Sequence, residues 1–233
     1  MSDWIYIYVL LIMGACLQNT IGFGLGLLCA PVLMHIAPEL VPVPMILSAL
    51  LITSIITYGN IRDVDFKQTT YSTLGGTVGI VIASVVMLNV QYEVYRMIFG
   101  GLILLGVGLS VVGLQPKVMP STSLIAGGFA GFMGTLTAAG GAPMGLLYQN
   151  AKQKSIRANL SIFFIYINGL AFLTLAVTGL VTKDDLINFA KCAPAILVGL
   201  GLSYHLNRYI NGDVIKPIIL FVAFLAGASI FVL

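Results

Sequence analysis

Long apolar stretches separated by short polar connections make up almost the whole chain. Eight stretches can be drawn, over residues 4–37, 40–59, 70–90, 95–114, 122–149, 158–181, 187–204 and 213–233. A helix needs about 20 apolar residues to cross the hydrocarbon core of a bilayer, and most of the stretches reach that length. The connections hold nearly all the charged residues. The pattern predicts an all-α polytopic membrane protein without a separate soluble domain.

The first and fifth stretches are the wrong length for one membrane crossing and carry helix-breaking residues in the middle. A single helix over the about 34 residues of the first stretch would be about 50 Å long, whereas the hydrocarbon core measures about 30 Å. Its centre reads QNTIGFGLGLLCAP (residues 18–31), and the centre of the fifth reads GTLTAAGGAP (residues 134–143). Both place small polar residues before glycines and an Ala-Pro pair. Each stretch therefore predicts a broken helix or a re-entrant hairpin.

The recurrence of this pattern predicts an internal duplication. Gly24 and Gly141 lie 117 residues apart, which is half of the chain, whereas the two Ala-Pro pairs lie 112 residues apart, so the register is loose. We expect two repeats of four apolar segments, over residues 1–116 and 117–233, with the broken segment first in each.

The distribution of Lys and Arg favours hairpins over crossings for the two long segments. Basic residues concentrate in the cytoplasmic connections of membrane proteins. If all eight segments cross, one side of the membrane collects five basic residues and the other six. If the first and fifth segments return to their own side, the counts become eight and three. The second arrangement obeys the rule, inverts the two repeats relative to each other and places both termini outside.

Composition and charge agree with a membrane protein and exclude other classes. Of the 233 residues, 59% are hydrophobic and 8% are charged, whereas a typical soluble domain has about 25% charged residues. The net charge of +3 is too small and too dispersed for nucleic-acid binding. We therefore expect the lipid bilayer as a partner, no nucleic acid, and a multi-pass location in the plasma membrane, which is the inner membrane in a bacterium.

The two broken segments form the candidate substrate site. Non-helical backbone at membrane depth is buried in protein or lines a watery cavity, and secondary transporters bind their substrates where half-helix ends meet. A half-helix N-terminus carries partial positive charge and free N–H groups, which suit an anion. The candidate substrate-binding residues are Gln18, Asn19, Thr20, Gly22, Phe23, Gly24, Thr135, Thr137, Gly140, Gly141 and Pro143. Close helix packing is the alternative explanation for the glycines.

One arginine joins this set from the start of the sixth segment. Arg157 follows Pro143 by fourteen residues, and a guanidinium there could pair a sulfonate or carboxylate through two parallel hydrogen bonds. A loop arginine beside Lys152 and Lys154 that simply follows the positive-inside rule is an equal alternative. No Asp or Glu lies in the middle of a segment, so the choice between a proton and a sodium ion for coupling stays open, as does assembly into a homo-oligomer.

At these residues the sequence resembles the TauE/SafE family of sulfite exporter-like permeases. The stretch GFGLGLLCAPVL (residues 22–33) resembles the glycine-rich first motif of the family, and GFMGTLTAAGGAPMGLLYQ (residues 131–149) resembles the second. Arg157-Ala158 resembles the opening of the following helix. The resemblance covers nearly the whole chain. It implies a permease for small sulfur-containing or carboxylate anions, such as sulfite, thiosulfate, sulfoacetate or other sulfonates, with no cofactor.

The sequence thus predicts a secondary transporter for a small anion that works by alternating access around two discontinuous helices. An anion channel built from the same hairpins is one alternative, and measured turnover separates the two. An intramembrane enzyme is a weaker alternative, because the sequence has no G-x-S-x-G motif, no H-E-x-x-H motif and no embedded pair of carboxylates. A membrane assembly subunit would need a hydrophilic groove or a cytoplasmic tail, which the sequence does not indicate.

Overall fold

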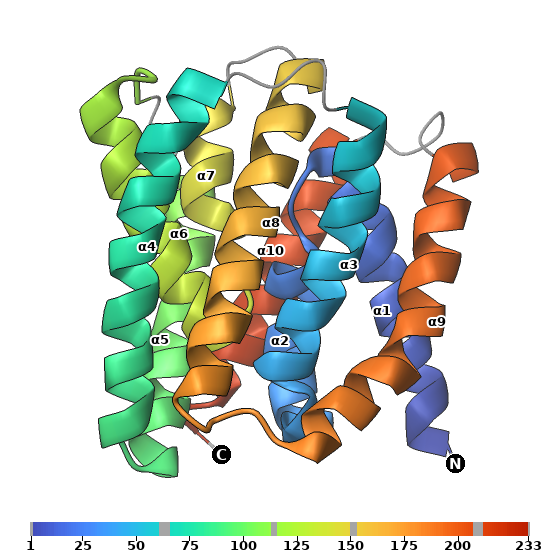
Figure 1. The fold of residues 1–233 in the computed structure, drawn as a ribbon. Helices are drawn as coiled ribbons and strands as arrows, with labels where there is room; N and C mark the ends of the chain where they lie inside the picture. The colour runs from blue at the N-terminus through green and yellow to red at the C-terminus, as the bar shows by residue number, and fades with distance from the viewer. Residues whose placement is uncertain (1, 61–65, 113–115, 150–152, 207–211, 233) are drawn as a thin grey trace.

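All regular structure in the described part of the chain is helical (Figure 1). The computed structural model describes residues 2–60, 66–112, 116–149, 153–206 and 212–232. The helices are α1 (Ser2–Ile21), α2 (Leu25–Ile36), the short 3-10 helix η1 (Pro38–Leu40), α3 (Val43–Asn60), α4 (Phe66–Asn89), α5 (Tyr92–Val111), α6 (Pro120–Thr137), α7 (Gly141–Tyr148), α8 (Gln153–Val177), α9 (Lys183–Leu206) and α10 (Gly212–Ser229). The described residues contain no β-strand. The predicted all-α class is confirmed.

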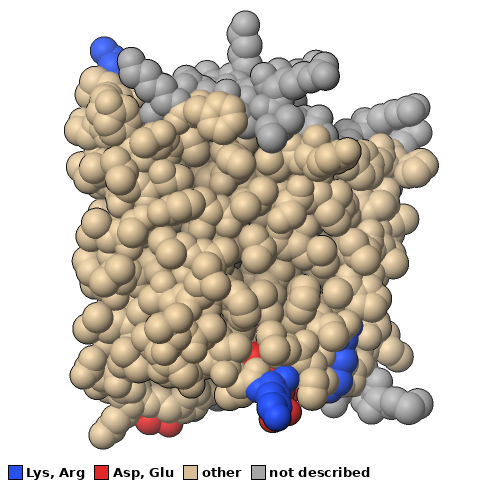
Figure 2. All heavy atoms as spheres, viewed as in Figure 1, with Lys and Arg blue, Asp and Glu red and all other residues tan. Residues whose placement is uncertain are grey.

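The lengths and surface of the helices are those of a multi-pass membrane protein. Five helical stretches are long and apolar enough to cross a membrane: Trp4–Ile21, Thr69–Asn89, Tyr92–Val111, Ala158–Val177 and Lys183–His205. Shorter apolar helices cover Leu25–Ile36, Val43–Tyr58 and Lys216–Ser229. On the face shown in Figure 2, the described charged side chains lie only at the two ends of the molecule. The wide uncharged band between them fits the hydrocarbon core of a bilayer.

The first apolar segment is broken between α1 and α2. Gly22 and Gly24 have φ angles of 94° and 140°, which a residue with a Cβ atom adopts only under strain. The chain then folds back, and α2 lies antiparallel beside α1, where the Cys29 thiol donates a hydrogen bond of 3.3 Å to the Leu10 carbonyl. The glycines therefore turn this segment into a hairpin.

The fifth segment is broken in the same way between α6 and α7. Ala138 has a φ of 56°, the left-handed region, and its N–H donates to the Gly134 carbonyl at 2.8 Å. The hydroxyl of Thr137 accepts a hydrogen bond of 3.1 Å from the N–H of Ala139. These bonds end α6, and α7 returns beside it, with Gly140 facing Gly134. The α1–α2 hairpin starts at the end of the molecule that carries both termini, and the α6–α7 hairpin starts at the opposite end (Figure 1).

The outer helices hold the hairpins through close backbone contacts and buried hydrogen bonds. Helices α4 and α6 pack side by side, and a Cβ on Gly75 would lie 2.8 Å from the carbonyl carbon of Leu124. Helix α9 packs along α1. There the Asn19 side-chain amide donates a 2.7 Å hydrogen bond to the Ser203 hydroxyl. Each hairpin thus packs against a long membrane helix from the other half of the chain.

Candidate substrate site

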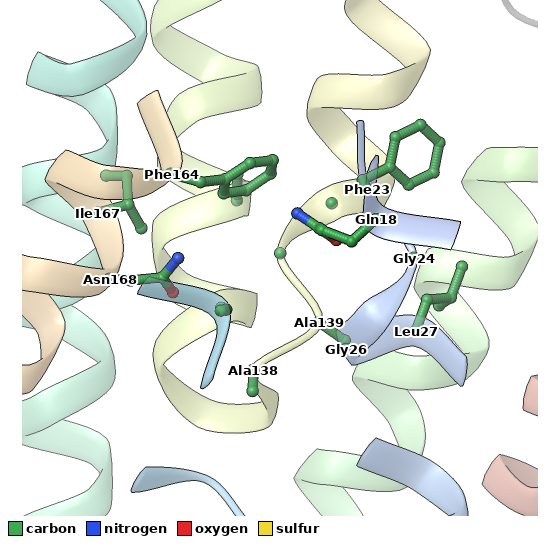
Figure 3. A pocket seen from close by; sticks show the side chains of 15 residues that line it. Gln18, Phe23, Gly24, Gly26, Leu27, Ala138, Ala139, Phe164, Ile167 and Asn168 are labelled. Carbon is green, nitrogen blue, oxygen red and sulfur yellow. The ribbon is translucent and has the colours of Figure 1, made fainter. Parts of the chain in front are cut away.

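A small cavity lies where the tips of the two hairpins meet (Figure 3). Residues from α1, α2, α3, α6, α7 and α8 line it, together with the breaks between the paired half-helices. Its volume is about 20 Å³, which is room for about one water molecule. The cavity is therefore too small for a larger ligand in this conformation.

Backbone contact between the two tips forms one wall of the cavity. Gly26, near the start of α2, lies against the break between α6 and α7, so that a Cβ on it would be 2.6 Å from the Ala138 carbonyl carbon and 2.9 Å from the Ala139 Cα. Both distances are shorter than real Cβ contacts allow. Only glycine lets the two tips approach so closely.

Gln18 spans the first break from the last turn of α1. Its Oε1 accepts a hydrogen bond of 3.2 Å from the N–H of Leu25, the first residue of α2, and its Nε2 donates to the Gly22 carbonyl at 3.3 Å. The side chain is buried and lines the cavity. Gln18 therefore fixes the position of α2 relative to α1 and places an amide at the cavity wall.

Phe23 joins the two hairpins. Its ring packs against two glycines of α7, since a Cβ on Gly141 would lie 3.1 Å from its Cδ2 and one on Gly145 would lie 2.5 Å from its Cζ. The same residue lines the cavity. A second small pocket, lined by Phe23 and by the exposed Lys216, lies next to it. Phe23 thus lines both the cavity and the neighbouring pocket, which the Lys216 side chain also lines.

The N-terminal ends of α2 and α7 both contribute to the cavity wall. Within the described residues, the N–H groups of Gly26, Leu27, Gly140 and Gly141 donate no hydrogen bond, and all four residues line the cavity. Neither helix has an acidic residue in its first turn. Each helix N-terminus carries about +0.5 of an elementary charge, so the wall is electropositive without containing a charged side chain among the described residues.

The structure brings five of the predicted site residues together around the cavity: Gln18, Phe23, Gly24, Gly140 and Gly141. Other predicted residues lie away from the cavity wall. The Asn19 amide bonds Ser203 on α9, and the Thr20 hydroxyl donates to the Cys16 carbonyl. The Thr135 and Thr137 hydroxyls donate to carbonyls one turn earlier in α6. Substrate contact by these residues stays a prediction.

The remaining predicted residues have other positions. Gly22 provides the positive φ at the first break. Pro143 is buried in α7 and lines an apolar groove with residues of α5 and α6. Arg157 belongs to α8, but its side chain lies outside the described part of the chain. Its pairing with an anion therefore stays a prediction.

Sequence reasoning missed Asn168, which lies in the middle of α8. Its side chain is 6% exposed and lines the cavity. In Figure 3, Asn168 and Gln18 enter the cavity from opposite sides. The signal was present in the sequence, because an amide inside the apolar run IFFIYINGLAF is the kind of intramembrane polar residue that faces a protein interior or a functional site.

Comparison with known protein families gives one match over nearly the whole chain. The model described as sulfite exporter TauE/SafE matches residues 6–230. Comparison with curated proteins and with solved structures gives no match.

Proposed function

Because the chain belongs to the sulfite exporter TauE/SafE family of membrane transporters, we propose that it carries a small sulfur-containing anion across the membrane. The candidate substrates are sulfite, thiosulfate and sulfonates such as sulfoacetate. One observation carries this proposal: the electropositive ends of two half-helices, α2 and α7, meet at a single buried cavity. Family membership makes the protein a transporter and not an enzyme.

The size of the cavity favours alternating access over a channel. A volume of about 20 Å³ accommodates about one water molecule, which is smaller than an anion of four or more heavy atoms. The substrate can therefore bind only after the helices around the cavity have moved apart. A transporter that opens its site to one side at a time has such closed states, whereas a conducting channel requires a continuous path.

The packing of the helices supports two inverted repeats, over residues 1–116 and 117–233. In this arrangement α1 to α5 of the first repeat correspond in order to α6 to α10 of the second. The contact between α1 and α9 then corresponds to the contact between α6 and α4, and both pairs of helices pack together. The contact of α2 with α10 likewise corresponds to that of α7 with α5. The pairs α3–α8 and α5–α10 each map onto themselves. The hairpins start from opposite ends of the molecule (Figure 1), which is the geometry of inverted repeats.

Flux through proteoliposomes tests the proposal. Purified protein is reconstituted into liposomes loaded with sulfite, thiosulfate or sulfoacetate, and release of each anion is followed with time. We expect saturable release of at least one of them. The variant Gly141→Leu, which forces a side chain into the Phe23 ring, should lose this activity while remaining folded. Gly101→Leu is the matched control, because nothing lies within 4 Å of a Cβ at that exposed position of α5.

The outcomes separate the alternatives. Release that does not saturate and is many orders of magnitude faster indicates a channel. Absence of release for all three anions, or wild-type release in Gly141→Leu, contradicts the proposed site.

A further inference from the structure

Asn168 is a buried polar side chain that lacks a partner. Its side chain is 6% exposed, and no hydrogen bond joins its amide to another described residue; unlike the fully enclosed, unpartnered hydroxyl of Ser48, this amide borders a cavity. Buried polar groups in folded proteins nearly always have a partner, and an unpartnered one is destabilising. The amide lines the cavity between the hairpin tips. The fold supplies no partner for this amide, so water can occupy that place in this conformation and a ligand can occupy it once the cavity has widened.

The charge that the described residues offer to such a ligand is small, and the Arg157 side chain lies outside this count. Among the described residues, no Lys, Arg, Asp or Glu lines the cavity. Lys216 lies at the neighbouring pocket, on the other side of the shared residues Phe23, Gly24 and Leu27. The two half-helix N-termini supply about +0.5 each, which together amount to about one positive charge.

This count matches an anion with one negative charge. A dianion in the same cavity would keep about one uncompensated negative charge away from water, which is strongly unfavourable. Asn168 fits a singly charged oxyanion as well, because its Nδ2 can donate to one oxygen while free N–H groups of α2 and α7 donate to the others. Its Oδ1 then accepts a hydrogen bond from a protonated oxygen or from a water molecule.

We propose that Asn168 is a substrate-recognition residue and that the cavity selects singly charged oxyanions, namely hydrogensulfite and sulfonates without a second acidic group, over dianions such as thiosulfate, sulfate and sulfoacetate. This inference rests on the proposed function and narrows its substrate class.

Methanesulfonate and sulfate test the charge rule directly, since both are tetrahedral and similar in size but carry one and two negative charges. The full-length protein in detergent is melted in potassium methanesulfonate or potassium sulfate at equal ionic strength, because ligands that bind the native state raise its melting temperature. Methanesulfonate should reach half of its maximal stabilisation at a concentration at least tenfold lower than sulfate. The stabilisation by sulfite should increase as the pH falls from mildly alkaline to mildly acidic, because the hydrogensulfite fraction rises.

Substitution of Asn168 tests its role. Asn168→Leu replaces the amide by an apolar side chain of similar size and should weaken methanesulfonate binding at least tenfold. Because it removes an unpartnered amide, the ligand-free protein should melt at the same temperature or higher. Thr174→Val is the control on the same helix, since the Thr174 hydroxyl donates only to the Leu170 carbonyl one turn earlier, and it should bind like the wild type.

The outcomes test the charge rule, the role of Asn168 and the proposed function separately. Sulfate binding equal to or tighter than methanesulfonate binding overturns the charge rule and leaves anion transport standing. Unchanged binding in Asn168→Leu, or a large drop in the melting temperature of its ligand-free form, overturns recognition by Asn168. Failure of every anion to stabilise the wild type removes both this inference and the proposed function.

Discussion

Gly26 is the point at which the two hairpin tips touch, and its replacement by alanine tests the architecture of the cavity. The added methyl group would lie 2.6 Å from the Ala138 carbonyl carbon, where ordinary contact begins at 3.4 Å. The Ala138 carbonyl oxygen would lie closer still, so the α6–α7 tip would have to retreat by more than about 0.8 Å. The atoms that it meets belong to the backbone, so a change of side-chain rotamer cannot relieve the overlap.

The expected loss follows from this displacement. Overpacking of a tight interior costs about 1–3 kcal/mol, and the need to move backbone places Gly26→Ala near the upper end of that range. The higher helix propensity of alanine returns at most about 1 kcal/mol. The net loss of unfolding free energy is about 2 kcal/mol, which corresponds to about 4–8 °C in melting temperature for a chain of this length.

Thermal unfolding in detergent measures this loss, with Gly101→Ala as the matched control. A Cβ on Gly101 has nothing within 4 Å, so the control should melt at the wild-type temperature or slightly above it. The displaced tip should also reduce anion flux in Gly26→Ala. A variant that melts and transports like the wild type would refute the contact between the hairpin tips.

Two hydrogen bonds give further predictions. A double-mutant cycle with Asn19→Leu and Ser203→Ala should show a coupling energy of about 0.6 kcal/mol in unfolding experiments, and a coupling of zero contradicts the 2.7 Å bond between α1 and α9. Tyr95→Phe removes the hydroxyl that donates to the Leu136 carbonyl at 2.8 Å. This variant should lower the unfolding free energy by about 1 kcal/mol. A melting temperature equal to that of the wild type would show that the bond does not stabilise the end of α6.

Much of the fold could be predicted because the breaks have a local cause. Glycine at residues 22 and 24 permits the φ angles of the first break, and the second break follows a similar run of small residues. The helix limits were less predictable. We expected the sixth segment to start at residue 158 and the third segment at residue 70, whereas α8 begins at Gln153 and α4 at Phe66. Hydropathy reports immersion in lipid, and a helix can continue past the membrane surface into polar residues.

The candidate site could be predicted only in part, because side-chain direction depends on tertiary packing. Thr135 and Thr137 have the polarity of ligand-binding residues, but in an apolar interior their hydroxyls are satisfied by carbonyls of their own helix. Asn168 has no helix break beside it, since α8 runs through it unbroken, and its amide within an apolar run is the one local signal. Its proximity to Gln18 arises from the packing of segments that are 150 residues apart.

The bond between Asn19 and Ser203 also constrains how the protein is made. Several buried hydroxyls donate within their own helix, so these groups can enter the bilayer with their helix without exposing an unsatisfied donor. The Asn19 amide instead finds its partner 184 residues later. At about 5–20 residues per second of synthesis, that partner emerges roughly 10–40 s after Asn19. During this interval α1 needs a temporary neighbour for its amide, either water at the membrane surface or a component of the insertion machinery.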